Sequence, residues 1–231
     1  MIAFIFNVIG RLGDKDGERN LRYYPLFLDI LGKKCVVVGG GEVAARKVTR
    51  LLECRAKVVV VSPKLTPELA RLKTEGAIEY FAAMYNIEYL EGAVLIIGAT
   101  DDENTNAAIS SDAGRLGIPV NIVDDPQKCT FILPSIVERG DLTFAVSTGG
   151  NSPALARRLR EELEERYGEE YAVLLELLGQ LRGKMEKNAG IGAIWFEKLL
   201  TAGLLDAIRI QDTSAMKKII RDITGEEVHI A

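Results

Sequence analysis

A glycine run early in the chain has the residue types and the spacing that bind a dinucleotide. Segment Val36–Lys47 reads as a strand of three valines, a turn of three glycines and the start of a helix. Within it, Gly39, Gly41 and Ala44 fit the G-x-G-x-x-G/A fingerprint. Gly39 permits a tight turn, Gly41 lets the backbone approach a pyrophosphate, and the small Ala44 lets the helix pack close to the strand.

The first turn of the following helix would complete a phosphate site. Glu42 and Val43 occupy this turn, where backbone N–H groups lack partners within the helix and the helix dipole is positive. We therefore expect Gly39, Gly41, Glu42 and Val43 to hold the phosphates of a dinucleotide. The alternative is a glycine-rich turn in an α/β protein that binds nothing.

The second predicted strand, Lys57–Val61, leaves the identity of the dinucleotide open. A ribose-binding Asp or Glu is expected about 20 residues after the glycines. This strand ends instead in Ser62, Pro63 and Lys64. Ser62 could bond a ribose hydroxyl, and Lys64 could approach a 2′-phosphate. These residues therefore do not choose between NAD and NADP, and we expect all three to lie at the cofactor.

The strand predicted over Val94–Ala99 ends in a polar loop. Thr100 and Asp101 follow it directly, and a helix begins near Asn104. Either Thr100 or Asp101 could cap this helix. We also expect both residues to lie beside the cofactor, because the loop follows a strand of the same sheet.

A pair of aspartates follows the predicted strand Pro119–Val123. Two adjacent carboxylates raise each other's pKa, which suits general acid/base chemistry. We expect Asp124, which leaves the strand, to be the catalytic base. Asp125 precedes Pro126 and is expected to form only a turn.

A second glycine loop, Ser147–Pro153, leads into another helix. Ser152 suits the N-cap position and Pro153 the first helical position, so the loop is a further candidate anion site. Arg157 follows at the second turn and could bind carboxylates, as could Arg158 and Arg160. The alternative is that these arginines pair with glutamates at helical spacing, namely Glu161, Glu162, Glu164 and Glu165.

The elements that must position these loops alternate regularly between residues 34 and 147. Apolar runs separated by helices predict an α/β fold with a Rossmann-like parallel sheet and helices on both faces. Ligands bind such sheets beyond the carboxyl ends of the strands. The remaining expected elements are strands Cys35–Val38, Ile78–Phe81 and Leu142–Ser147, helices Glu42–Glu53, Thr66–Glu75 and Asn104–Arg115, and a helical turn Tyr85–Tyr89.

After Pro153 the pattern changes to helices alone. This apolar region could pack on a second subunit or on its own sheet. We therefore expect three parts: an extension at 1–20, a dinucleotide-binding domain at 21–150, and a helical region for dimerisation and substrate binding at 151–231. The expected helices are Ala154–Tyr167, Glu170–Gly183, Ile194–Leu200, Leu204–Ile210 and Ala215–Thr224.

The composition of the chain argues against several classes of function. The chain has 231 residues, is 48% hydrophobic and carries a formal net charge of −4, which gives no sign of nucleic-acid binding. No apolar run approaches the roughly 18 residues needed to span a bilayer. Cys35, Cys54 and Cys129 are scattered and odd in number, which favours a reducing cytoplasm. With His229 the sole histidine, we expect no resident metal site.

Six motifs in order resemble one known family, the precorrin-2 dehydrogenase/sirohydrochlorin ferrochelatase family, which forms the N-terminal module of siroheme synthases. The resemblance covers roughly residues 22–185 and matches the stand-alone form, without the methyltransferase domain of the fused enzymes. The motifs are Tyr24–Asp29, Val36–Lys47, Ala99–Asp102, Asn121–Asp124, Phe131–Ser135 and Ser147–Pro153.

The resemblance implies NAD-dependent oxidation of precorrin-2 to sirohydrochlorin. Some members also insert Fe²⁺, so Fe²⁺ is a candidate second substrate. The family is homodimeric, its catalytic aspartate falls at Asp124, and a serine phosphorylated in some members falls at Thr148. Precorrin-2 carries eight carboxylates, which would suit a glycine loop flanked by arginines. The residues expected at the substrate are Asn121, Thr148, Gly149, Gly150, Ser152 and Arg157.

Two other readings remain open from the residues. An oxidoreductase with another small substrate would keep the glycine fingerprint but would not need the Ser147–Pro153 loop. A regulatory module that senses NAD would not need Asp124.

Overall fold

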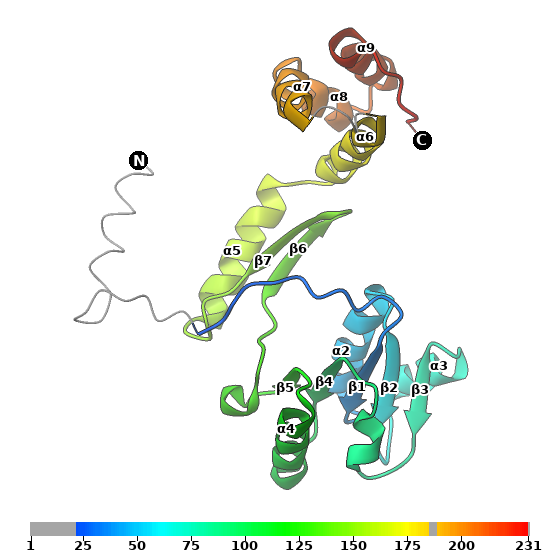
Figure 1. Ribbon diagram of the computed structural model, residues 1–231, viewed down its shortest axis with the longest axis vertical. Coiled ribbons are helices and arrows are strands. Elements are labelled where there is room, and N and C mark those ends of the chain that lie inside the picture. The colour runs from blue at the N-terminus through cyan, green and yellow to red at the C-terminus, as the bar shows by residue number, and fades with distance from the viewer. Residues whose placement is uncertain (1–21, 185–188, 231) are drawn as a thin grey trace, which may run out of the picture. The chain divides into compact units, whose positions relative to one another are not determined.

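The computed structural model describes residues 22–184 and 189–230, and the chain divides into two compact units (Figure 1). The first is Met1–Leu133 and the second is Pro134–Ala231. The extension expected at residues 1–20 lies outside the described residues. The division falls after residue 133, whereas the sequence predicts a domain boundary after residue 150.

The first unit contains a five-stranded parallel sheet, which confirms the predicted Rossmann-like architecture. Its strands lie in the order β3-β2-β1-β4-β5. The order reverses between β1 and β4, and α/β sheets bind ligands at such a switch point. The strands are β1 (Lys34–Val38), β2 (Lys57–Val61), β3 (Ile78–Phe81), β4 (Leu95–Gly98) and β5 (Val120–Ile122).

Helices cover both faces of this sheet, as the continuous apolar strands predicted. Val37 and its neighbours on one face pack against α2 (Glu42–Glu53) and α3 (Pro67–Thr74). Val36 and Val38 point to the other face, where they share a core with α4 (Glu103–Leu116) and with the 3₁₀ turn η1 (Ile87–Leu90). A second 3₁₀ turn, η2 (Pro126–Lys128), follows β5.

The second unit begins with an antiparallel hairpin, and this corrects one sequence prediction. Leu142–Ser147 was expected as the last strand of the parallel sheet. Instead β7 (Leu142–Val146) pairs with β6 (Ser135–Arg139), a strand that the sequence reading did not predict. Gly140, at φ +56°, forms part of the short connection between them. A connection this short cannot join parallel strands, which need a crossover of a dozen or more residues.

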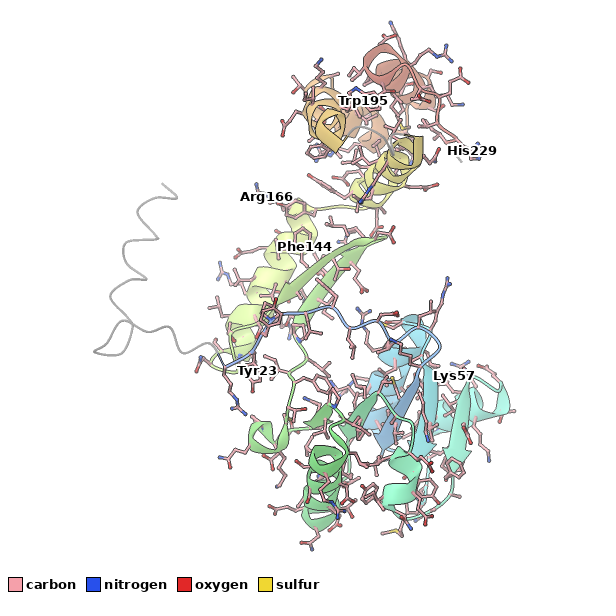
Figure 2. The ribbon with its side chains drawn as sticks, in the orientation of Figure 1. Tyr23, Lys57, Phe144, Arg166, Trp195 and His229 are labelled. Carbon is pink, nitrogen blue, oxygen red and sulfur yellow. The ribbon has the colours of Figure 1, made fainter. Side chains whose placement is uncertain are left out.

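The rest of the second unit is helical, as predicted. Aromatic contacts tie the hairpin to the chain after α5. The ring centroid of Phe144 lies 4.7 Å from that of Tyr167, and Phe144 is labelled in Figure 2. The helices are α5 (Pro153–Arg166), α6 (Glu170–Lys184), α7 (Ala189–Thr201), α8 (Leu204–Arg209) and α9 (Thr213–Thr224).

The apolar faces of the last helices form a core of their own. Leu177 from α6, Leu199 from α7, Leu204 from α8 and Ile220 from α9 belong to one buried cluster. The helical region therefore buries much of its apolar surface internally. The sequence left open whether this apolar region packs on a second subunit or on its own sheet. Packing of the helices on one another is a third arrangement.

Candidate functional site

The loops after β1, β2, β4 and β5 meet at one edge of the parallel sheet, which we call the carboxyl edge. Backbone hydrogen bonds continue across it beyond the strand ends. The N–H of Gly39 donates to the carbonyl of Val61 at 2.9 Å, and that of Ala99 to Val38 at 2.8 Å. The N–H of Val123 donates to Gly98 at 2.9 Å. The predicted cofactor loops and the turn that contains Asp124 thus follow one continuous ladder.

The three glycines of the turn have different surroundings. A Cβ on Gly39 would lie 2.2 Å from the carbonyl oxygen of Ala99, and its φ of +127° also requires glycine. A Cβ on Gly40 would lie 1.9 Å from the carbonyl oxygen of Lys64. A Cβ on Gly41 would meet nothing within 4 Å. Gly39 and Gly40 therefore let neighbouring loops close, whereas Gly41 borders open space.

The first turn of α2 faces this space with unsatisfied donors. Gly41 is the N-cap residue in an extended conformation and contributes no side-chain cap. Its carbonyl accepts from Ala45, but the N–H groups of Glu42 and Val43 have no acceptor among the described residues. Free N–H groups at a helix start beside an open glycine fit the pyrophosphate of a dinucleotide.

The loop after β2 places Ser62 differently from the sequence reading. Ser62 is buried, and its hydroxyl donates to the carbonyl of Lys64 at 2.8 Å. The side-chain proton expected to reach a ribose is thus used inside the loop. Pro63 and Lys64 are exposed, so Lys64 is the residue of this loop that is free to approach a ribose or a 2′-phosphate.

The loop after β4 is held by an asparagine that the sequence reading missed. The amide of Asn106 donates to the carbonyl of Thr100 at 2.9 Å, and the Thr100 hydroxyl donates to Asn106 Oδ1 at 2.9 Å. The helix cap is Asp102, which accepts from the N–H of Thr105 at 2.9 Å. The expectation that Thr100 or Asp101 caps this helix is therefore wrong. The sequence did contain a signal for this cap, because an N-cap side chain accepts from the N–H group three residues later, and Asp102 precedes Thr105 by three residues.

Asp124 is exposed and lies in a tight turn at the carboxyl edge. The N–H of Asp125 donates to the carbonyl of Ile122 at 3.2 Å and closes a four-residue turn, Ile122–Asp125, which we call the Asp124 turn. Asp124 adopts φ +61° at the third position, where glycine or asparagine is preferred. Because unfavourable backbone conformations cluster at functional sites, an aspartate in this conformation indicates a functional role for its side chain.

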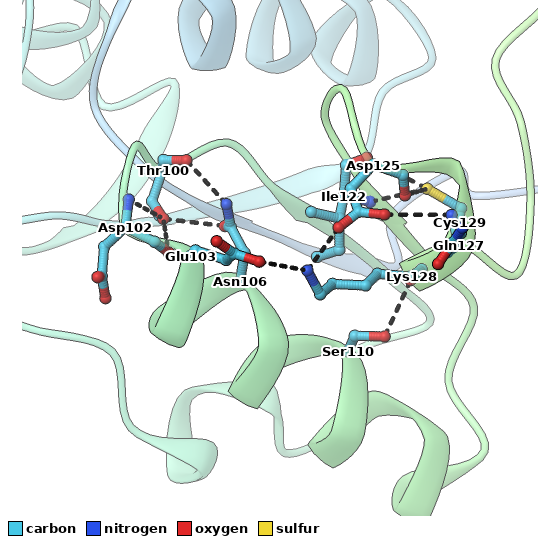
Figure 3. A network of polar contacts seen from close by, with 10 residues as sticks. All are labelled: Thr100, Asp102, Glu103, Asn106, Ser110, Ile122, Asp125, Gln127, Lys128 and Cys129. Carbon is cyan, nitrogen blue, oxygen red and sulfur yellow. Dashed lines mark hydrogen bonds and ion pairs between the residues drawn. The ribbon is translucent and has the colours of Figure 1, made fainter.

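Asp125 has a structural role, as the sequence reading favoured (Figure 3). Its carboxylate caps the 3₁₀ turn η2 through the N–H of Gln127 and pairs with Lys128 at 2.5 Å. Lys128 also reaches Glu103 on α4 at 3.5 Å. The hydrogen bond from Lys128 lowers the pKa of Asp125. The expected mutual increase in the pKa of the two adjacent aspartates is thus wrong for Asp125, because a cation lies closer to it.

The side-chain amide of Asn121 is hydrogen-bonded within the protein. Its amide donates to the carbonyl of Phe131 at 3.0 Å. On the same side of β5, Cys129 exchanges hydrogen bonds with the backbone of Ile122 at 3.2 Å, and Thr130 accepts from Val120 N–H at 2.8 Å. The segment after η2 is thereby fastened along β5, and the amide expected at the substrate is occupied.

The second glycine loop belongs to the second unit and closes on itself. The Thr148 hydroxyl donates to the carbonyl of Ser152 at 3.0 Å, and Ser152 caps α5 through Leu155 N–H at 3.2 Å. Gly149 and Gly150 adopt φ +62° and +88°, which suit glycine. The predicted cap is confirmed, and Gly150 has open space around its Cα.

The arginines of α5 pair with glutamates one turn away. Arg157 contacts Glu161 at 2.9 Å and Arg158 contacts Glu162 at 3.0 Å, while Arg160 contacts Glu164. This is the alternative that the sequence left open. Because these pairs are mostly exposed, each contributes only a few tenths of a kcal/mol, so an incoming carboxylate could displace them at low cost.

Two further observations concern metals and membranes. Within residues 22–184 and 189–230, no three His, Cys, Asp or Glu side chains gather in a way that could hold a metal ion. Cys35 and Cys129 are buried free thiols, and burial raises the pKa of Cys35 to about 11. None of the described helices is both long and apolar enough to cross a membrane.

Comparisons with known proteins agree with this geometry. Residues 26–135 match a family model described as putative NAD(P)-binding, and residues 139–166 match one described as the central part of the sirohaem biosynthesis protein. The first unit is therefore a domain for a nicotinamide dinucleotide.

Relatives cover most of this chain. Siroheme synthase of Methylobacillus flagellatus is 45% identical over 168 residues, which are 73% of this chain and 36% of the relative. Siroheme synthase 1 of Aeromonas salmonicida is 38% identical over 209 residues, 89% of this chain and 45% of the relative. The chain thus spans less than half the length of these curated relatives.

A solved structure titled "SirC, precorrin-2 dehydrogenase" superposes with a TM-score of 0.68 at 25% identity. The match covers 88% of this chain and all of that one. Together these matches show that the chain belongs to the precorrin-2 dehydrogenase/sirohydrochlorin ferrochelatase family, which includes the module found in siroheme synthases.

Proposed function

We propose that this chain is an NAD-dependent precorrin-2 dehydrogenase that produces sirohydrochlorin for siroheme biosynthesis. The observation that carries the proposal is the carboxyl edge of the first unit. The Gly41 turn has open space beside it, and the first N–H groups of α2 have no acceptor in the part of the chain that the structure describes. The turn with the exposed carboxylate of Asp124 is joined to the same edge by the continuous series of backbone hydrogen bonds described above. The match to a precorrin-2 dehydrogenase over its whole length supports the substrate.

The reaction removes a hydride and a proton from the substrate. The dinucleotide, when bound, supplies the hydride acceptor. The open turn at Gly41 and the backbone N–H groups of Glu42 and Val43 would hold its pyrophosphate, and the Thr100 loop, fixed by Asn106, would border it. Asp124 accepts the proton, because its carboxylate is exposed and its turn is rigidly closed by Ile122 and Asp125.

We assign NAD rather than NADP as the cofactor, on the family resemblance. In the loop after β2, only Lys64 offers an exposed charge toward a 2′-phosphate. Steady-state oxidation of precorrin-2 with each dinucleotide tests this assignment. A higher kcat/KM with NADP than with NAD would reverse it.

The remaining site residues are proposed from the second unit. The loop Thr148–Ser152 and Arg157 would hold carboxylates of the tetrapyrrole, with the exposed arginine pairs opening to do so. A homodimer is proposed, as in the resembling family. Cytoplasmic location is proposed because Cys35, Cys54 and Cys129 are all free thiols.

The direct experiment is anaerobic addition of precorrin-2 to the purified protein with NAD, followed by absorbance of NADH and of sirohydrochlorin. Formation of both in equal amounts supports the proposal. NAD binding without turnover would instead support the regulatory module, and turnover of another small substrate alone would support a different oxidoreductase.

We further propose that ferrous iron insertion is slow compared with oxidation. Asp124 can supply a base, but Cys129 is buried and hydrogen-bonded to the backbone of Ile122, and no three His, Cys, Asp or Glu side chains of the described residues gather to hold a metal ion. Anaerobic incubation of sirohydrochlorin with Fe²⁺ measures this. Siroheme formation as fast as precorrin-2 oxidation, lost in Asp124→Asn, would show a bifunctional enzyme.

A further inference from the structure

Lys47 is a half-buried cation next to the catalytic edge that the proposed mechanism does not use. It lies on α2, where its neighbours Ala44, Ala45 and Val48 are fully buried in the core that Val123 also joins. Val123 immediately precedes Asp124. The helix thus carries Lys47 toward the side of the sheet from which the Asp124 turn emerges.

The electrostatic surroundings of Lys47 are unusual for a lysine. Burial lowers its pKa, the adjacent Arg46 lowers it further, and Asp124 acts in the opposite direction. Lys47 and Asp124 therefore interact through space, yet no ion pair joins them. Lys47 has no hydrogen-bonded or ion-pair partner within the described parts of the chain. Half-burying an ammonium group without a partner is unfavourable unless a ligand supplies one.

A second cation reaches the same turn from another segment. The guanidinium of Arg22 donates to the carbonyl of Pro126 at 3.3 Å and lies 5.0 Å from the ring centroid of Tyr23. Pro126 directly follows the Asp124 turn. Arg22 is exposed. A guanidinium is suited to bind a carboxylate through two parallel hydrogen bonds.

We propose that Lys47 and Arg22 form a two-point anchor that binds carboxylates of the tetrapyrrole around the Asp124 turn. This anchor rests on the proposed function, because it assigns residues that orient that substrate. Two cations beside one base would place a polycarboxylate with a defined face toward Asp124. They thereby determine which ring position loses its proton.

The test measures binding of the product sirohydrochlorin, without metal and under anaerobic conditions, by fluorescence titration. Because no chemical step is involved, binding is separated from the action of Asp124. The variants are Lys47→Met, Lys47→Arg and Arg22→Met. The matched control is Lys57→Met, an exposed lysine at the start of β2 (Figure 2).

We expect Lys47→Met to weaken sirohydrochlorin binding about tenfold, as for a lost charge-assisted hydrogen bond in a half-buried site. Arg22→Met should weaken it by about threefold, because exposed ion pairs are worth less. Lys47→Arg should bind within about threefold of wild type, and Lys57→Met like wild type. Affinity for NAD should not change in any variant, and raising the salt concentration should affect Lys47→Met least.

Other outcomes overturn the anchor or the function separately. Equal sirohydrochlorin binding by wild type and Lys47→Met would reject the anchor and leave the dehydrogenase intact. A parallel loss of NAD affinity in Lys47→Met would assign the lysine to the cofactor site or the fold, which also rejects it. A wild-type protein that neither binds sirohydrochlorin nor oxidises precorrin-2 would reject the proposed function, and the anchor with it.

Discussion

The backbone of Asp124 separates a structural requirement from a chemical one. Its φ of +61° would be met more easily by glycine. The turn therefore does not need a carboxylate in order to fold, and the side chain is the part that function must explain. This distinction makes the residue testable in two directions.

The first prediction concerns Asp124→Asn and Asp124→Gly. Both should lower dehydrogenase turnover by at least the roughly hundredfold typical of a lost general base, and both should keep NAD affinity. Asp124→Gly should unfold with a free energy equal to wild type or up to about 1 kcal/mol higher, because the left-handed conformation is relieved. Turnover assays and chemical denaturation measure these effects. Near-normal turnover of either folded variant would remove Asp124 from the mechanism.

The second prediction separates the glycines of the turn. Gly41→Val should fold normally, since its Cβ meets nothing, and should lose NAD binding because the side chain would occupy the pyrophosphate space. Gly40→Ala should be destabilised instead, because its Cβ would lie 1.9 Å from the carbonyl oxygen of Lys64. Calorimetric titration and thermal unfolding distinguish the two. Unchanged NAD affinity in Gly41→Val would make the turn purely structural.

For single residues of the site, the sequence predicted the place in the fold better than the partners of the side chain. Gly39, Gly41 and Asp124 lie at strand ends where spacing alone placed them, because strand and helix periods are local. The occupied side chains of Ser62 and Asn121 were not foreseeable, since their partners, Lys64 and Phe131, depend on loop geometry. Asp125 likewise gained its partner Lys128 only when η2 formed.

Among the elements, the turn η2 ties Asp124 to α4. Asp125, Lys128 and Glu103 link the loop after β5 to the first turn of α4 (Figure 3). The folded pKa of Asp125 lies below its unfolded value. Its stabilising effect is therefore complete above the unfolded carboxyl pKa of about 3.9 and is lost as pH falls toward the folded value.

The third prediction follows from this sign. Asp125→Asn should be less stable than wild type at neutral pH, and the difference should shrink below about pH 4, where the wild-type carboxyl becomes protonated. Urea denaturation of both proteins across pH 3 to 7 is the measurement. A difference that stays constant with pH would show that the charge of the Asp125 carboxylate contributes nothing to stability.

The elements themselves were largely predictable from sequence, with one instructive failure. Parallel strands such as β1 and β2 are continuous apolar runs, and they are recognisable because both faces are buried. β6 and β7 are mostly half-buried, with Val137 the one buried residue of the two strands, so neither forms the continuous buried run by which the parallel strands are recognised. The ends of the helices of the second unit were predicted closely, except that α7 begins at Ala189 and not at the expected Ile194. The packing of these helices on one another was not predicted.

In the whole molecule, two sets of cores stabilise two units. The clusters around Val37 and Val36 contain only residues of the first unit, and the cluster around Leu177 only residues of the second. Because cooperativity in unfolding arises within a shared core, a single two-state transition is not expected.

The fourth prediction is that calorimetry shows two transitions, of which NAD raises only one. At 100 times its Kd, a ligand stabilises the state that binds it by about 2.7 kcal/mol. That stabilisation should appear in the transition lowered by Ile97→Ala, a core residue of the first unit. The transition lowered by Leu177→Ala should not respond to NAD. One merged transition shifted by both variants would show that the units unfold together.

The hydrogen bonds along β5 bear on how copies of the molecule meet. An open edge strand offers unpaired backbone groups to another chain. On β5 the outward groups of Val120 and Ile122 are taken by Thr130 and Cys129. Two residues of irregular chain, Cys129 and Thr130, therefore cover this strand without forming a strand themselves. The outer side of the edge strand β5 is thereby closed to strand addition from another chain.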